Sequence, residues 1–149
     1  MISLTADYAL RAILLLAQPE TSRACSADEV AAATGAPRNY MAKVLNVVTK
    51  AGIITSMRGP TGGFTLAVPP TEITLGRIID LFDAEPVNPR CMLGNRPCDP
   101  ARPCRAHAAW KAVTDARRSP FLTTTIADLL DGRVAPFAVH LAPESLNVA

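Results

Sequence analysis

The sequence predicts a mainly α-helical fold that carries one small β-hairpin. Three observations predict it. Apolar residues recur at helical spacing in several segments, capping residues and glycines separate those segments, and two short β-rich stretches flank a glycine-rich turn. The chain has 149 residues, of which 49% are hydrophobic and 19% charged. This is enough for one folded domain with an appended helical segment, and the composition excludes a disordered protein.

The first predicted helix covers residues 4–17 and follows a capping serine, Ser3. Its apolar side chains fall on two sides of the helix rather than on one. In a small protein, such a helix usually buries its second side against another body. We therefore expect a partner chain.

Two more helices and a tight turn follow. Ser26 and Glu29 have the spacing of a capping box, which opens a short helix, and Gly35 ends it. A third helix is predicted over residues 37–50, with a proline at its start. This layout is typical of a helix-turn-helix, whose second helix enters the major groove of DNA. The residues of this helix that we expect to read DNA are Arg38, Asn39, Tyr40 and Lys43.

A β-hairpin is predicted from residues 53–55 and 64–68, with glycines in the turn between them. We interpret it as a wing beside the helix-turn-helix. Glycines allow close approach to a sugar-phosphate surface, and Arg58 in the turn is suited to a minor groove or a phosphate. Thr61 is a second expected contact. A nucleotide-binding loop needs a strand-loop-helix order, whereas both flanks of this turn are strands.

The distribution of charge is more informative than the net charge of +2. No Asp or Glu occurs between Glu29 and Glu72, a stretch that contains four Lys or Arg. No apolar run is long enough to cross a bilayer and no export signal is evident, so we expect a cytoplasmic protein without a membrane partner. In a reducing compartment, four cysteines indicate metal or redox chemistry before disulfides.

The C-terminal half is predicted to hold three helices and one long loop. Thr74 caps a helix that runs through Asp83, a long helix covers 104–118 until Pro120 breaks it, and a last helix covers about 124–131. We divide the chain into four parts: a DNA-binding domain over 1–83, a cysteine-rich loop over 84–103, helices over 104–132 and an irregular tail over 133–149. Loops as long as the second part are usually functional.

The loop and the start of the next helix place three thiols and an imidazole within 17 residues: Cys91, Cys98, Cys104 and His107. Six and five residues separate the cysteines, which is too wide for the paired thiols of a zinc finger. The spacing suits a loop around a larger inorganic group, and thiolates are the usual ligands of iron-sulfur clusters. Two alternatives stay open, a structural zinc ion and reactive thiols without metal.

The remaining cysteine, Cys25, stands alone and is interpreted as a small buried apolar residue. No Ser/His/Asp arrangement, carboxylate pair or nucleotide-binding motif has a convincing context. We therefore expect no enzyme and no small-molecule substrate.

Over about residues 1–132 the chain resembles the Rrf-two family of winged-helix transcription regulators, with its iron-sulfur-sensing IscR-, NsrR- and RirA-like branches. The resemblance rests on the opening Leu-Thr-Ala-Asp-Tyr-Ala-Leu-Arg, the helix-turn-helix, the Arg-Gly-Pro-Thr-Gly-Gly-Phe wing, the three-cysteine loop and Thr-Ile-Ala-Asp-Leu at 125–129. It implies a homodimer whose seam is the helix over 104–118, which would bind a palindromic double-stranded DNA operator, most simply as a repressor.

The resemblance also implies a 2Fe-2S or 4Fe-4S cluster on Cys91, Cys98 and Cys104, whose state shifts the affinity for DNA in response to redox state, nitric oxide, oxygen or iron. The fourth ligand stays open. His107 matches the histidine ligand of IscR-like members, and Asp7 matches the aspartate that reaches the cluster from the other subunit in NsrR-like members. Well-known members commonly have five residues between the first two cysteines, where this chain has six, so the cluster type stays open as well.

Overall fold

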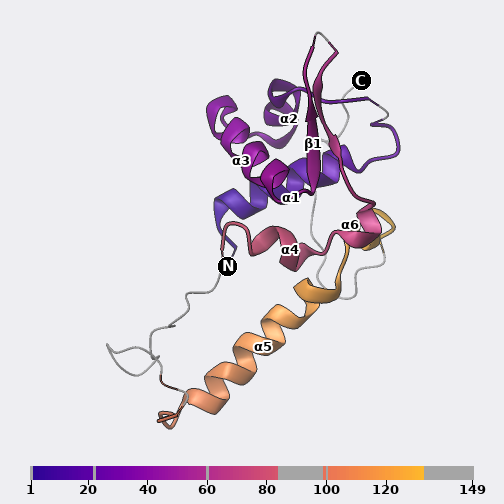
Figure 1. The fold of residues 1–149 in the computed structure, drawn as a ribbon. Helices are drawn as coiled ribbons and strands as arrows, with labels where there is room; N and C mark the ends of the chain where they lie inside the picture. The colour runs from indigo at the N-terminus through magenta and orange to yellow at the C-terminus, as the bar shows by residue number, and fades with distance from the viewer. Residues whose placement is uncertain (1, 22, 60, 84–98, 100, 133–149) are drawn as a thin grey trace.

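The structure is a computed structural model that describes residues 2–21, 23–59, 61–83, 99 and 101–132. Its elements are α1 (Leu4–Leu16), α2 (Ala27–Thr34), α3 (Arg38–Lys50), β1 (Ile54–Met57), β2 (Gly63–Leu66), the 3-10 helix η1 (Pro70–Glu72), α4 (Leu75–Ile79), α5 (His107–Thr123) and α6 (Ile126–Leu130). The mainly helical fold with one small hairpin is confirmed. Helix α5 projects from a body that the other elements form (Figure 1).

Helix α1 lies at the centre of this body. Ser3 caps it, because the serine hydroxyl accepts the N–H of Ala6 at 3.2 Å. Its buried residues are Ala6, Ala9, Ala12, Ile13, Leu14, Leu15 and Leu16. All of them except Ala6 pack in one core with the buried residues of α3, namely Met41, Val44, Leu45 and Val48. Each large buried aliphatic side chain contributes about 1.5–3 kcal/mol, so this packing holds α3 against α1.

The helix-turn-helix consists of α2 and α3. The predicted capping box is present: the Ser26 N–H donates to the Glu29 carboxylate at 2.7 Å, and the Glu29 N–H donates to the Ser26 hydroxyl at 3.3 Å. Gly35 ends α2 with a φ of +71°, a conformation that other residues rarely adopt. Pro37 is the N-cap residue of α3, with a ψ of 132° that is not helical, so the helix begins one residue later than predicted.

The two strands pair antiparallel, with Ile54 opposite Leu66 and Met57 opposite Gly63. Strand β1 starts one residue later than predicted because the N–H of Ile53 still bonds to Val48 at the end of α3. The turn end of strand β2 is fixed to the segment before α2. Phe64 and Cys25 exchange two backbone hydrogen bonds, of 2.8 and 3.1 Å.

Helix α4 ends at Ile79, so the prediction of a helix through Asp83 was wrong. The chain turns after α4, where the N–H of Phe82 bonds to Ile79 at 3.0 Å. The turn brings the carboxylate of Asp83 to the first N–H of the α1 cap, at 2.7 Å from the nitrogen of Ser3. A helix continued through Asp83 would follow a different path and forgo the bonds of this turn.

Helix α5 also differs from the prediction, because it begins at His107 instead of Cys104 and continues through Pro120 to Thr123. A proline inside a helix removes one hydrogen bond, and contacts with α4 support this last turn. The carbonyl of Thr124 accepts the N–H of Leu75 at 2.9 Å. A Cβ at Gly76 would lie 2.9 Å from the side chain of Leu122, so α4 and α5 touch closely there.

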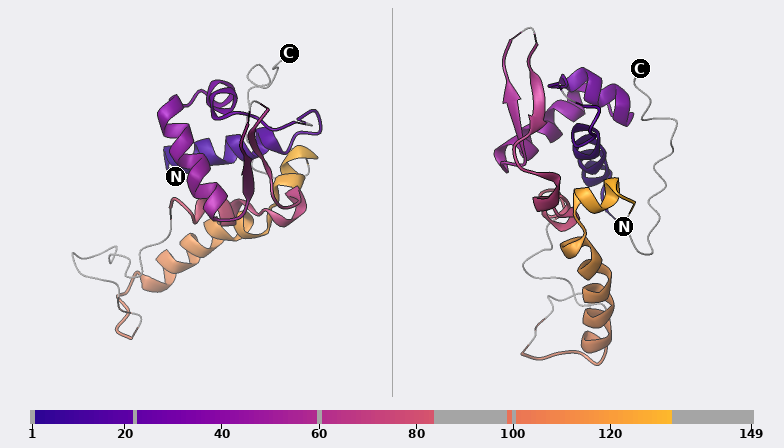
Figure 2. Two further views of the ribbon diagram at one scale, coloured as in Figure 1. Left: turned by 45° about the horizontal axis from the view of Figure 1, so that its top comes forward. Right: turned by 90° about the vertical axis from the view of Figure 1, so that its right-hand side faces the viewer.

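Helix α6 is shorter than predicted and starts at Ile126, after a capping box of Thr125 and Asp128. Ile126 is fully buried, and its N–H donates to Ile73 at 2.8 Å. The helix thus packs with the body, as both views of Figure 2 show. The four-part division of the chain stays a prediction, to which the structure adds this contact between α6 and the first part.

Candidate nucleic-acid interface and metal ligands

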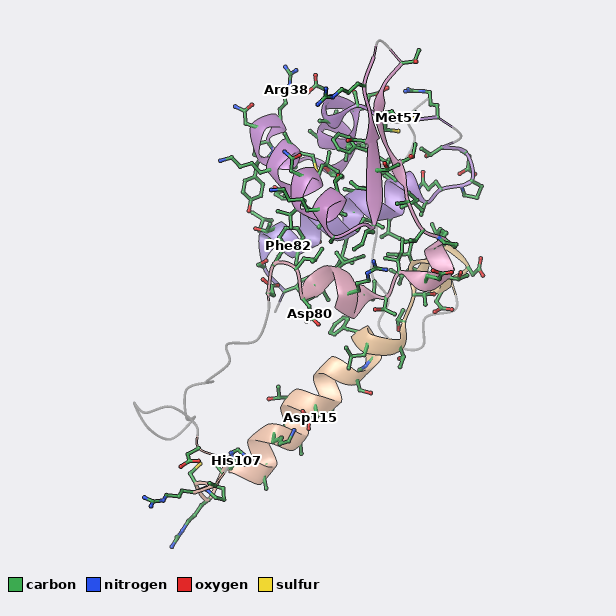
Figure 3. The ribbon with its side chains drawn as sticks, viewed as in Figure 1. Arg38, Met57, Asp80, Phe82, His107 and Asp115 are labelled. Carbon is green, nitrogen blue, oxygen red and sulfur yellow. The ribbon has the colours of Figure 1, made fainter. Side chains whose placement is uncertain are left out.

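The first turns of α3 present polar side chains to solvent on the side opposite the core. Arg38, Asn39 and Lys43 are exposed, as the helical spacing predicts. Arg38 forms an ion pair through its Nε with Asp28 of α2. Arg38 and Met57, the last residue of β1, are at the same end of the molecule, whereas His107 is at the opposite end (Figure 3).

The turn of the hairpin adds Arg58 and Thr61, which are also exposed. Within the residues that the structure describes, Arg58 and Lys43 take part in no ion pair. Their positive charges are therefore available to an anionic surface. An exposed basic helix face beside an exposed basic loop is an arrangement suited to the phosphates of DNA.

Tyr40 differs from its neighbours on α3. It is half-buried, and its hydroxyl hydrogen-bonds to the hydroxyl of Thr5 on α1. Its ring meets the ring of Tyr8 edge to face, with centroids 6.1 Å apart and planes at 71°. The side chain of Tyr40 is thus directed to α1, which its place among exposed residues did not indicate.

Electrostatics at the start of α2 depend on Glu29. Hydrogen bonds from Arg23 and from the backbone and hydroxyl of Ser26 lower the pKa of Glu29 to about 2. Burial raises the pKa of the nearby Cys25 thiol, which keeps it protonated. Cys25 is 9% exposed within the core, as its isolated position in the sequence predicts.

Of the predicted cysteine ligands, only Cys104 lies within the described residues, since Cys91 and Cys98 fall outside them. Cys104 is half-buried in the turn before α5 and forms no disulfide within the described part of the chain. Its carbonyl accepts the N–H of His107 at 3.0 Å, so the two candidate ligands share one turn.

Asp7 forms an ion pair of 2.8 Å with Arg11, one turn along α1. In Figure 3 the start of α5, marked by His107, lies far from the body that contains α1. A single chain therefore does not bring Asp7 to Cys104. Among the residues described, no group of three or more His, Cys, Asp or Glu side chains is gathered at one point.

Sequence reasoning missed three residues that contact the candidate interface or its support. They are Asp28, which pairs with Arg38; Thr5, which bonds to Tyr40; and Asp83, which holds the cap of α1. Each contact joins different elements. Of the three, only Asp28 carried a local signal in the sequence, because it is an acidic residue in the first turn of a helix.

A helix-turn-helix with an exposed basic second helix, packed beside a glycine-rich hairpin, defines a winged-helix DNA-binding protein. Comparison with known proteins agrees with this class. The chain matches, over residues 2–132, the family model "Rrf2: Iron-dependent Transcriptional regulator", and it belongs to this family. No helix in the described ranges is long and apolar enough to span a membrane.

Individual relatives agree. The chain is 35% identical over 129 residues to a protein of Aquifex aeolicus (strain VF5) described as an HTH-type transcriptional regulator, which covers 85% of this chain and 89% of the relative. Among solved structures, T. potens IscR superposes with a TM-score of 0.71 at 25% identity over 90% of this chain and 88% of that one. CymR, the global cysteine regulator of B. subtilis, gives 0.70 at 25% identity over 89% and 97%. The chain is thus a transcriptional regulator, and its relatives are not enzymes.

Proposed function

We propose that this regulator is a homodimer that binds a palindromic operator, most simply as a repressor, with an affinity controlled by an iron-sulfur cluster on Cys91, Cys98 and Cys104. One observation carries the proposal. Cys104 and His107 share a turn at the start of α5, the helix that projects from the DNA-binding body. Ligands at this point connect cluster chemistry to the helix that the family resemblance assigns to the dimer seam.

The chemistry of the donors fits such a group. Cys104 is half-buried, forms no disulfide within the described residues, and precedes His107 by three residues. Thiolates with one histidine or carboxylate form a reasonable ligand set for a cluster. When bound, the cluster would supply an inorganic centre that reacts with oxidants or nitric oxide. Asp7, held on α1 away from the Cys104 of its own chain, would come from the partner subunit, whereas His107 would come from the same chain.

The proposed DNA contacts are those on the exposed end of the molecule. Arg38 and Asn39 at the start of α3 would read bases, Lys43 would contact phosphate, and Arg58 with Thr61 would place the hairpin against the backbone or minor groove. Removing Lys43 as Lys43→Gln should weaken binding to all sequences alike and reduce the salt slope by about 1. Removing the Arg38 side chain should relax the preference for one base, with a loss of about 1–3 kcal/mol in the free energy that discriminates the preferred base from the others.

Dimerisation is supported by apolar side chains that the single chain leaves in solvent. On α5, Val113 is 54% exposed and Leu122 48%, and on α1 Leu4 is 64% exposed. Such residues are usually buried, and a second copy would cover them. A two-fold dimer would also place two copies of α3 against two half-sites.

The experiment that tests the cluster is native mass spectrometry of protein purified without oxygen, read beside the visible absorption spectrum. We expect a dimer with the mass of 2Fe-2S or 4Fe-4S per subunit and charge-transfer bands. Cys104→Ala should abolish both signals, whereas Cys25→Ala, which removes a thiol outside the set, should retain them. Loss on His107→Ala or on Asp7→Asn would identify the fourth ligand.

A second candidate is regulation by the thiols themselves, which the similarity to a cysteine regulator favours. In that case the protein would carry no cluster even after anaerobic reconstitution, and peroxide would change its affinity for DNA through the loop cysteines. Colourless protein with one zinc per chain would instead indicate a structural metal.

A further inference from the structure

Tyr40 makes two contacts with one turn of a neighbouring helix. Its hydroxyl bonds to Thr5, and its ring packs edge to face on Tyr8, three residues along α1. Residues three apart lie on the same side of a helix. The phenol of Tyr40 is therefore fixed at its ring and at its tip, which restrains both the position and the rotation of the first turn of α3.

The first turn of α1 is itself held firmly. Ser3 caps the helix, and its N–H is held by the carboxylate of Asp83. Ala6 and Ala9, which flank Tyr8 on the inner side, are fully buried. Because this turn is anchored from both sides, it provides a rigid support for Tyr40.

We propose that Tyr40 is a positioning residue that sets the angle at which the start of α3 enters DNA, and that it does not contact DNA itself. The inference rests on the proposed role of α3 as the recognition helix. Arg38 and Asn39 precede Tyr40 directly, so a rotation of this turn changes where both side chains point. Readout of a base edge requires hydrogen-bond distances to be met closely, and a small rotation is enough to lose them.

The test measures binding of the full-length protein to a duplex that the wild-type protein selects from a random-sequence pool, across a range of salt concentrations. The variants are Tyr40→Phe, Thr5→Val and the double variant. A hydrogen bond of this kind changes an equilibrium about 2- to 12-fold. We expect each single variant to weaken binding by a factor in this range, with an unchanged salt slope. We expect the double variant to bind DNA as tightly as the single variant that binds less tightly, because each single substitution already removes the same hydrogen bond.

Two results would overturn the proposal. A salt slope that falls by about 0.9 in Tyr40→Phe would show that the hydroxyl contacts a phosphate. Additive losses in the double variant would show that Thr5 and Tyr40 act separately. Urea unfolding of the same variants supplies a third criterion, since lower stability with unchanged affinity would reduce the contact to a structural role.

The control is Lys43→Gln, at an exposed position on the same helix. If Lys43→Gln lowers the salt slope while Tyr40→Phe leaves it unchanged, positioning and direct contact are separated on one helix. If neither Lys43→Gln nor Arg38→Ala affects binding, the proposed interface on α3 fails as a whole, which is a different outcome from failure of the role of Tyr40.

Discussion

Arg38 is held by an acid on the neighbouring helix. Its partner Asp28 is 52% exposed and Arg38 itself 75%, so the ion pair contributes at most about 1 kcal/mol. A phosphate or base edge would compete with Asp28 for the guanidinium. We expect Asp28→Asn to tighten binding to DNA about 2- to 5-fold, because the competing charge is gone.

The measurement is the Kd for operator and non-operator duplexes. Asp115→Asn is the matched control, because it removes an exposed ion pair with Lys111 on α5, at a distance from this interface. Weaker binding by Asp28→Asn would contradict the prediction and would mean that Asp28 orients Arg38 for DNA.

Glu29 makes the stability of α2 depend on pH. Its pKa is lowered to about 2 in the folded protein, first by Arg23 and then by Ser26, from an ordinary value of 4.5. A lowered pKa stabilises the folded state fully above the unfolded value, and this stabilisation is lost as the pH falls from about 4.5 through about 2. The side chain is 42% exposed, so solvent screening keeps the contribution to about 1 kcal/mol.

Glu29→Gln should therefore lower the free energy of unfolding at pH 7 and have a progressively smaller effect towards pH 2. Urea unfolding of both proteins at several pH values measures the difference. A difference that stays constant across this range would exclude titration of Glu29 as its source.

At the level of whole elements, the hairpin depends on a close approach at the residue where β2 leaves the turn. A Cβ on Gly63 would lie 2.5 Å from the carbonyl oxygen of Cys25. Gly63→Ala must push the strand away from the segment before α2 and should destabilise the protein by about 1–3 kcal/mol. Thermal unfolding measures this, with Thr61→Ala in the exposed turn as the control that should change little. An unchanged Tm in Gly63→Ala would show that the hairpin can shift without cost.

The sequence predicts an element well when the residues that set its ends lie next to those ends. Helices α1 to α3 begin and end within one residue of the prediction because Ser3, the Ser26 capping box and Gly35 lie next to the boundaries they set. The end of α4 and the course of α5 through Pro120 were not predicted, because contacts across the fold support them. Asp83 and Ser3, for example, are 80 residues apart.

The candidate site follows the same rule. Helical spacing predicts that Arg38, Asn39 and Lys43 are exposed, since a buried stripe on one side of a helix leaves the other side to solvent. It does not predict the direction of Tyr40, whose partner Thr5 lies 35 residues away. For Cys91 and Cys98, the sequence motif and the family resemblance remain the basis of the prediction.

For the whole molecule, the proposed dimer predicts a clear effect of charge on α5. Val113 is a large apolar residue of α5 and is 54% exposed in the single chain. We expect Val113→Asp to dissociate the dimer and to weaken operator binding at least about 100-fold, because one recognition helix then replaces two. Native mass spectrometry and gel filtration measure the assembly. Ala108→Asp lies well round the helix from Val113 and should leave the dimer intact; a dimer that survives Val113→Asp would place the interface elsewhere.

The attachment of α5 at one end makes it a lever. Its fulcrum is the close contact of Gly76 with Leu122, supported by the bond between Leu75 and Thr124, while Cys104 lies beyond the opposite end. A helix of 17 residues is roughly 25 Å long, so a tilt of about 10° at the fulcrum swings its far end by about 4 Å. In the reverse direction, a force that displaces Cys104 would act on α4 as a torque, equal to that force multiplied by the length of the arm.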